Sequence, residues 1–131
     1  MDLIFSAFAT LDGFRENADA NRGREVYYRC IVVALVSAKQ QNPDCEVALV
    51  TNAPMPAPFD QQLARAGVTI YQCPFDRFRF GADLPWSLAF YKLCALDWVL
   101  NHLTFDRCAL LDTDTYTQYP LTDLWREADE A

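Results

Sequence analysis

The residues best suited to chemistry in this chain of 131 residues are two aspartates, Asp112 and Asp114. They follow the apolar run 108–111, which is typical of a buried strand. Two ionised carboxylates this close repel each other, so a proton or a cation must neutralise the pair. Oxygen ligands select a hard divalent ion, and two aspartates leave most of its coordination shell open to phosphate oxygens. The pattern predicts a Mn²⁺ or Mg²⁺ site that holds a diphosphate and absorbs charge on a departing phosphate.

An Asp-x-Asp pattern is weak by itself. The chain has thirteen aspartates, so roughly one such match is expected by chance. The alternative is a structural turn in which Asp112 or Asp114 accepts hydrogen bonds from nearby backbone N–H groups. The apolar strand before the pair and the polar residues after it make the metal interpretation about as well supported as the turn interpretation, and both stay open.

The elements that must position these carboxylates follow from hydrophobic patterning. Strands are predicted at 3–9, 45–52, 68–74 and 107–111. Helices are predicted at 25–41, 59–66, 86–103 and 121–128, with loops at 10–24 and 75–85. Gly67 is expected to end the second helix, and Pro85 suits the first turn of the third. The buried stripe of that third helix is expected to consist of Trp86, Ala89, Phe90, Leu93, Leu96, Leu100 and Leu103, with Lys92 and His102 off it.

Strict alternation of strand and helix predicts a single α/β domain over residues 1–131. Apolar strands in that order imply a mainly parallel sheet with helices on both faces. Ligands of such sheets bind beyond the carboxyl ends of the strands. Residues 7–10 and 51–52 end two further strands, so they are expected to border one crevice with Asp112 and Asp114.

Other candidate residues each have a functional and a structural interpretation. Lys92 is the obvious phosphate partner, as a point charge, although a solvated lysine on a helix is commoner. His102 is the only histidine and is expected at the surface near a helix C-terminus. Tyr27, Tyr28 and Trp86 suit stacking on a base, but aromatic residues at helix starts are more often packing residues.

Bulk composition narrows the class of protein. The net charge of −7 disfavours a nucleic acid or an anionic membrane surface as partner. No stretch approaches the roughly 20 apolar residues of a transmembrane helix, and residues 1–10 read as a strand rather than a signal peptide. The five cysteines form no Cys-x-x-Cys pair, so buried free thiols in the cytoplasm are expected.

The segment "FDRCALLDTDTYTQYPLTDLW" resembles the Asp-x-Asp region of GT-A fold glycosyltransferases, closest to the family 8-like, lipopolysaccharide-galactosyltransferase and glycogenin type. Those enzymes continue from an apolar strand through Asp-x-Asp to a "pL..LW" helix. "MDLIFSAF" resembles their first strand. "VYYRCIVVALVSAKQQNPDCEV" is similar to their first helix, with a tyrosine near its start, a serine ten residues on and then Asn-Pro. "FYKLCAL" resembles their Tyr-x-Arg-Leu helix. The likeness is colinear over nearly the whole chain.

The resemblance implies a Rossmann-like GT-A fold and a glycosyltransferase that uses a nucleotide-diphosphate sugar, UDP-sugar being favoured. It implies that Asp112 and Asp114 hold the metal against the diphosphate and that Asp112 also approaches the ribose or sugar. Ala7, Phe8 and Tyr27 would cradle the base, and Lys92 stands at the position of the family's donor-contacting arginine. Phe8 departs from the polar or acidic residue that is usual at the first strand's tip.

A complete GT-A domain is longer, and its third metal ligand and acceptor-binding elements lie downstream of Asp-x-Asp. The chain is therefore expected to be the donor-binding N-terminal part, with the fold incomplete and the acceptor unknown. Two alternatives follow. A nucleotide-sugar-binding fragment would bind the donor without transferring the sugar. A haloacid-dehalogenase-like phosphatase would use Asp112 as nucleophile and Asp114 as acid/base, although that motif normally opens its domain and continues Gly-Thr.

Overall fold

The computed structural model describes residues 1–9, 20–76 and 90–131, with side chains from Glu25 onward in the first helix. Its elements alternate strictly in the order β1, α1, β2, α2, β3, α3, β4, α4. The strands are β1 (Leu3–Phe8), β2 (Glu46–Thr51), β3 (Thr69–Gln72) and β4 (Cys108–Leu110). The helices are α1 (Ala20–Gln41), α2 (Phe59–Arg65), α3 (Tyr91–His102) and α4 (Thr122–Glu130). The predicted α/β class is confirmed.

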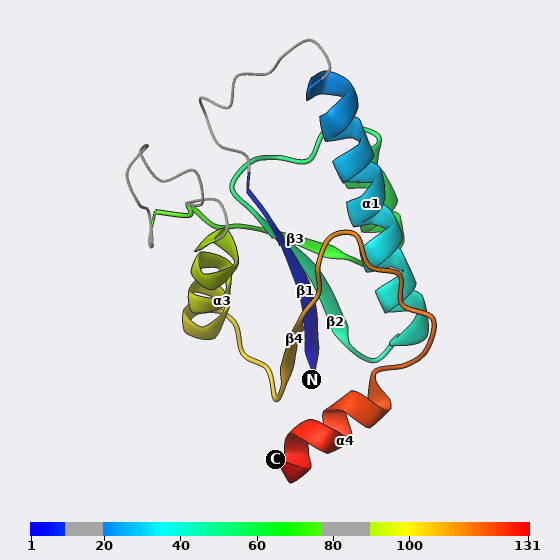
Figure 1. Ribbon diagram of the computed structural model, residues 1–131, viewed down its shortest axis with the longest axis vertical. Helices are drawn as coiled ribbons and strands as arrows, with labels where there is room; N and C mark the ends of the chain where they lie inside the picture. The colour runs from blue at the N-terminus through cyan, green and yellow to red at the C-terminus, as the bar shows by residue number, and fades with distance from the viewer. Residues whose placement is uncertain (10–19, 77–89) are drawn as a thin grey trace.

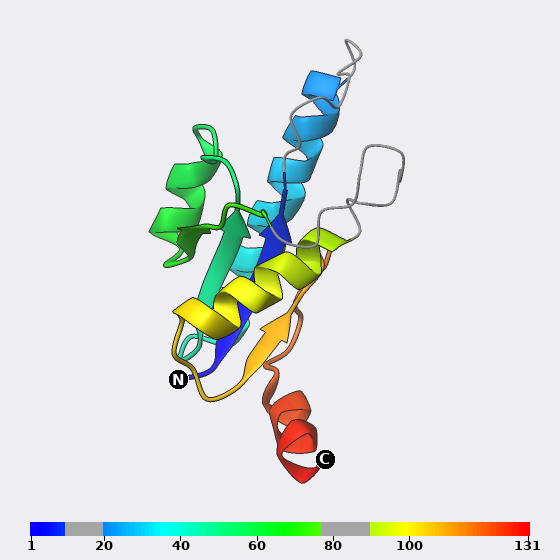
Figure 2. The same ribbon diagram turned by 90° about the vertical axis from the view of Figure 1, so that its left-hand side faces the viewer.

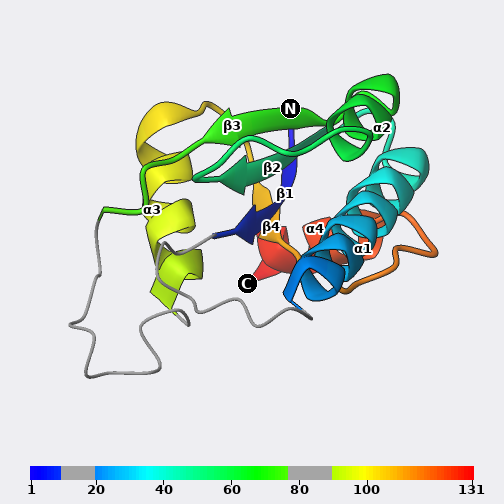
Figure 3. The ribbon, with the colours of Figure 1, turned by 90° about the horizontal axis from the view of Figure 1, so that it is seen from above.

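The strands form one parallel sheet in the order β3-β2-β1-β4. Figure 3 shows this sheet between α3 on one face and α1 with α2 on the other. The three layers are also visible from the side in Figure 1, where α4 lies near the N-terminus. The described strands are thus all parallel, and helices cover both faces as the alternation predicted.

Both faces of β1 and β2 are buried, which explains why their sequences are apolar without alternation. Ile4 and Val47 face α1 and α2, in a core that includes Leu35 and Leu63. Phe5 and its neighbours Leu3 and Ala7 face the opposite core, with Cys94, Ala95 and Val99 of α3. The sheet is therefore held between two hydrophobic cores, and β1 lies at its centre.

Helix ends are set by specific residues. Lys39 donates to the carbonyls of Pro43 and Cys45, at 3.1 and 2.8 Å, just beyond α1. After α2, Gly67 has a φ of +79°, which glycine adopts at little cost. The N–H groups of Gly67 and Val68 bond back to Ala64 and Leu63, at 3.0 Å each, which is a Schellman motif. Gly67 therefore ends α2 as predicted.

Two expectations about helices were wrong. The backbone of 20–24 is helical and belongs to α1, so the predicted loop is shorter than 10–24; its residues 10–19 lie outside the described ranges. In α3 the buried residues are Cys94, Ala95 and Val99, whereas Leu93 and Leu100 of the predicted stripe are exposed. Large leucines dominated the periodicity, whereas the small side chains of Cys94 and Ala95 are the ones that pack with Phe5 and Ala7 of β1. Pro85, Trp86 and Ala89 lie outside the described part of the chain, as do residues 77–85 of the second predicted loop.

In Figure 2, α3 lies in front of the sheet and crosses it at an angle, and the segment after β4 leads down to α4. No helix in the described ranges is both long and apolar enough to cross a membrane.

The thiols of all five cysteines are free, with Cys45, Cys73 and Cys94 buried and Cys30 and Cys108 half-buried.

Candidate metal and donor site

The site begins where β4 ends. Strand β4 pairs with β1 so that Leu110 lies opposite Phe5. Leu111 continues along β1 because its N–H donates to the carbonyl of Phe5 at 2.9 Å. The Ser6 hydroxyl, fully buried, donates to the carbonyl of Leu111 at 2.8 Å. Two hydrogen bonds from the central strand thus fix the residue immediately before Asp112.

Asp112 opens a tight turn. The N–H and the hydroxyl of Thr115 both donate to the backbone carbonyl of Asp112, at 3.3 and 2.8 Å. This closure uses the backbone of Asp112, so its carboxylate stays available. In the structural alternative a carboxylate of Asp112 or Asp114 caps the turn, but the bonds that close it here come from Thr115 to a carbonyl. Both aspartates are exposed.

Lys92, in the first turn of α3, reaches this turn directly. Its Nζ forms an ion pair with Oδ1 of Asp112, with the two side chains 39% and 58% exposed. The hydrogen bond to Asp112 raises the pKa of Lys92, opposed by desolvation. Lys92 is therefore neither a freely solvated lysine nor a buried one, and it partners one of the two predicted metal ligands.

Asp114 lies close enough to act electrostatically on the same group of residues. Its charge helps to raise the pKa of Lys92, as a smaller contribution than that of Asp112. Burial first, and then the charges of Asp112 and Asp114, raise the pKa of Tyr91. Within the described ranges, the Asp114 carboxylate has no ion-pair partner. The structure therefore brings Lys92, Asp112 and Asp114 together, with Tyr91 beside them.

The two carboxylates fit a divalent ion in part. Both belong to exposed residues of one turn, and the bonds from Thr115 that close this turn go to a backbone carbonyl, so the carboxylate oxygens can serve as ligands of a hard cation. In the described part of the chain, no group of three or more histidine, cysteine, aspartate or glutamate side chains is placed to hold a metal ion. A metal at Asp112 and Asp114 would draw its other ligands from water and phosphate oxygens.

Two of the residues expected to bind the base, Phe8 and Tyr27, belong to a separate aromatic group near the carboxyl end of β1. The Phe8 ring lies 6.3 Å from that of Tyr27 and 5.8 Å from that of Tyr28, and Tyr28 packs at 5.5 Å on Phe59. Tyr27 is exposed and Phe8 is half-buried, so both have surface that a planar ligand can reach. The side chain of Ala7 is buried in the core, which leaves only its backbone for a ligand.

Two other candidate residues, Thr51 and His102, do not take part in this site. Thr51, opposite Phe8 in the sheet, is buried, and its hydroxyl makes a 3.3 Å contact with the carbonyl of Ala53. His102 is exposed at the end of α3, stacks on Trp98 at 4.7 Å between ring centroids, and does not lie with the aspartates. It is the surface histidine that the sequence predicted. Thr10 and Trp86 lie outside the described residues.

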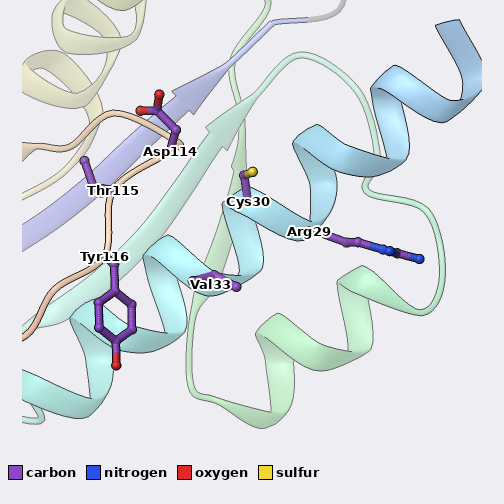
Figure 4. A pocket seen from close by; sticks show the side chains of 6 residues that line it. All are labelled: Arg29, Cys30, Val33, Asp114, Thr115 and Tyr116. Carbon is purple, nitrogen blue, oxygen red and sulfur yellow. The ribbon is translucent and has the colours of Figure 1, made fainter. Parts of the chain in front are cut away.

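Sequence reasoning missed a pocket of about 230 Å³ between α1 and the turn. It is lined by Arg29, Cys30, Val33, Asp114, Thr115 and Tyr116. Figure 4 shows Cys30 and Val33 on α1 facing the segment that carries Thr115 and Tyr116, with Arg29 extending away. The guanidinium of Arg29 pairs with Glu25 at 2.6 Å. Val33 of this lining is exposed, but in the sequence it belongs to a continuous apolar run, so no sequence signal set it apart.

Buried polar side chains of α1 and of the residue that follows it hold the segment after the turn. Ser37 Oγ accepts the N–H of Thr117 at 3.0 Å, and Asn42 Oδ1 accepts the N–H of Leu121 at 2.8 Å. The Asn42 amide also donates to the carbonyl of Ala38 at 2.9 Å. These bonds give Ser37 and Asn42 a structural role, since they tie the segment after the turn to the C-terminal end of α1.

Comparison of the sequence with models of known protein families gives no match, and comparison with curated protein sequences gives none either.

Proposed function

We propose that this chain is the donor-binding part of a metal-dependent glycosyltransferase of the GT-A type, with a UDP-sugar as the favoured donor. The observation that carries the proposal is the turn of Asp112 and Asp114, with exposed carboxylates and the ammonium of Lys92 beside them. Such an arrangement combines two anionic oxygen ligands for Mn²⁺ or Mg²⁺ with one cation for a phosphate group. It lies at the carboxyl end of a parallel sheet, where ligands of α/β proteins bind.

Each residue has a defined role in this proposal. Asp112 and Asp114 would hold a Mn²⁺ or Mg²⁺ ion, which would supply positive charge to offset that of the diphosphate and of the leaving nucleotide. Lys92 neutralises a phosphate oxygen, and the exposed ring of Tyr27 with Phe8 offers a surface for the base. Ser6 positions Asp112 through the carbonyl of Leu111. The sugar acceptor is left unassigned.

The test is calorimetric titration of UDP, UDP-glucose and UDP-galactose into the protein, with Mn²⁺ and with EDTA. The double variant Asp112→Asn/Asp114→Asn keeps the side-chain shape and removes both charges. We expect metal-dependent binding in the native protein and at least about a tenfold loss in the variant. Equal binding by both proteins, or none with either, would refute the assignment of these carboxylates.

The same samples separate the alternatives. A binding fragment binds the nucleotide-sugar with Mn²⁺ but releases no free UDP in the presence of sugar acceptors or water. A phosphatase of the haloacid-dehalogenase type releases phosphate from p-nitrophenyl phosphate and loses this activity in Asp112→Asn. Release of UDP with sugar transfer supports the glycosyltransferase itself.

A further inference from the structure

At the predicted metal site, the positive charge next to the aspartates is the ammonium group of Lys92. Lys92 and Asp112 form their ion pair through the same carboxylate that the proposed metal requires. The pair joins the first turn of α3 to the turn after β4. Because both side chains are substantially exposed, the contact can open without disturbing either core.

A metal ion and the ammonium group compete for Asp112. Asp112 and Asp114 carry two negative charges, of which Lys92 compensates one. A divalent ion on these carboxylates would repel the ammonium and occupy the lone-pair directions that it uses. A lysine can leave Asp112 easily, because its ammonium group is carried on a flexible four-carbon chain. Unlike the guanidinium of arginine, the ammonium group does not bind a carboxylate through two fixed parallel N–H groups.

From this geometry we infer that Lys92 is an exchangeable counter-ion of the site. Without metal it neutralises Asp112, and on metal binding it moves from Asp112 to the phosphate oxygens of the incoming diphosphate. This inference rests on the proposed function and adds to it a coupling between the two ligands. Each ligand favours the other, because the metal frees Lys92 for phosphate and the phosphate draws Lys92 away from Asp112. Such coupling is reciprocal by thermodynamic necessity.

The inference predicts effects of opposite sign in one variant. Lys92→Met removes the competitor but keeps the aliphatic stem. Breaking an exposed ion pair of this kind changes an equilibrium by about 1.5- to 5-fold, so Mn²⁺ alone should bind about 2- to 5-fold tighter. UDP in saturating Mn²⁺ should bind about tenfold weaker, because a charge-assisted contact to phosphate is lost. A residue with only a structural role would weaken both.

Two further variants serve as controls in the same calorimetric titrations. Lys92→Arg keeps the charge and can bind Asp112 through two N–H groups, so Mn²⁺ alone should bind no tighter than to the native protein. Arg65→Gln removes one positive charge from the exposed end of α2, before β3 begins. Strand β3 is at the opposite edge of the sheet from β4, which leads to Asp112, so neither affinity should change appreciably.

A direct measurement of the exchange is possible because the chain has only two lysines, Lys39 and Lys92. Protein labelled with ¹³C at lysine Cε should give two signals, and the Lys92→Met variant assigns them. Adding diamagnetic Mg²⁺ should shift the Lys92 signal, and adding UDP should shift it again. The Lys39 signal should stay in place, since Lys39 is bound to two backbone carbonyls at the end of α1.

Failure of the inference and failure of the proposed function look different. If Mn²⁺ binds the native protein and Lys92→Met equally, or the variant more weakly, the counter-ion role is wrong and the metal site stands. A Lys92 signal that does not shift in saturating Mg²⁺ would also refute the counter-ion role, however the variant folds. If Mn²⁺ binds the native protein no better than Asp112→Asn/Asp114→Asn, both the metal site and the counter-ion role are wrong.

Discussion

The hydroxyl of Ser6, in the centre of β1, donates a 2.8 Å hydrogen bond to the carbonyl of Leu111, 105 positions later in the chain. Leu111 immediately precedes Asp112, so a buried side chain of the first strand sets the direction in which the turn of Asp112 and Asp114 leaves the sheet. Ser6 makes no contact with a ligand in this arrangement and acts only through the backbone.

Under the proposed function, Ser6→Ala should therefore weaken the binding of Mn²⁺ without changing either carboxylate. The lost bond leaves the Leu111 carbonyl without its side-chain donor, and we expect a cost of about 1–2 kcal/mol in the free energy of unfolding. Mn²⁺ affinity should fall about tenfold, as for other residues that orient metal ligands. Chemical denaturation and calorimetry measure the two effects.

Ser37→Ala is the matched control for Ser6→Ala. Ser37 is also a buried serine with hydrogen bonds to the backbone, donating to Ala34 and accepting from Thr117, both at 3.0 Å. Its loss should lower stability by a similar amount and leave Mn²⁺ affinity nearly unchanged. Equal losses of affinity in both variants would contradict a positioning role that is specific to Ser6.

Asn42→Ala should loosen the segment between the turn and α4. Asn42 is buried and holds Leu121 and the end of α1 together through its side-chain amide. We expect a loss of about 1–3 kcal/mol in unfolding free energy, because buried donors and acceptors lose their partners. Amide hydrogen exchange should rise most around Leu121. The exposed neighbour Gln40, changed to alanine, should have almost no effect on either measurement.

Arg107→Met should release α4 from the sheet. The Arg107 guanidinium binds both oxygens of Asp2 at 2.9 and 2.7 Å, pairs with Asp129 at 2.6 Å, and lies 5.4 Å from the centre of the Trp125 ring. Without these contacts, the buried Trp125 should become more exposed, with a red-shifted fluorescence, and trypsin should cut faster after Arg126. Arg126→Met, on the exposed side of α4, should leave the fluorescence unchanged.

The contact between Tyr71 and Glu46 predicts a pH dependence. The Tyr71 hydroxyl donates to Oε1 of Glu46, and this bond raises the pKa of Tyr71 from its ordinary 10.0 to about 12. A raised pKa means that the neutral phenol is favoured in the folded state, so the stabilisation is complete below pH 10. It should be lost as the pH rises from 10 to 12.

Tyr71→Phe isolates that contribution. The difference in unfolding free energy between the native protein and Tyr71→Phe should be constant up to about pH 9 and shrink steadily above about pH 10. The other tyrosines are common to both proteins and largely cancel. A difference that grows with pH would show that the hydrogen bond favours the phenolate instead.

Much of the fold was predictable from the sequence because its strands and helices differ clearly in length. The apolar runs of β1 and β2 reflect burial on both faces, and Gly67 marks the end of α2 by its backbone geometry. The rotation of α3 was not predictable from periodicity. Which face of that helix is buried depends on how closely Cys94 and Ala95 approach the sheet, and this is a property of packing.

The charged residues of the candidate site could be selected from the sequence, but the residues that hold them in place could not. Asp112, Asp114 and Lys92 were chosen by residue type and position, and the structure brings them together. Their mutual contact was not expected, because nothing in the spacing of 20 residues between Lys92 and Asp112 implies a direct pair. Ser6 looked like an ordinary polar residue in an apolar strand, and Asn42 was noted only as part of an Asn-Pro pair. Only the tertiary structure gives their hydrogen-bond partners, Leu111 and Leu121.

The placement of β1 between β2 and β4 has a consequence for how the protein folds. Strand β1 comes first in the chain among the four described strands, but one of its two edges pairs with β4, whose residues lie more than a hundred positions later. Closing a loop of that length is slow compared with forming local helices. The turn that carries Asp112 and Asp114 is therefore expected to form later than the local helices and later than the pairing of β1 with β2.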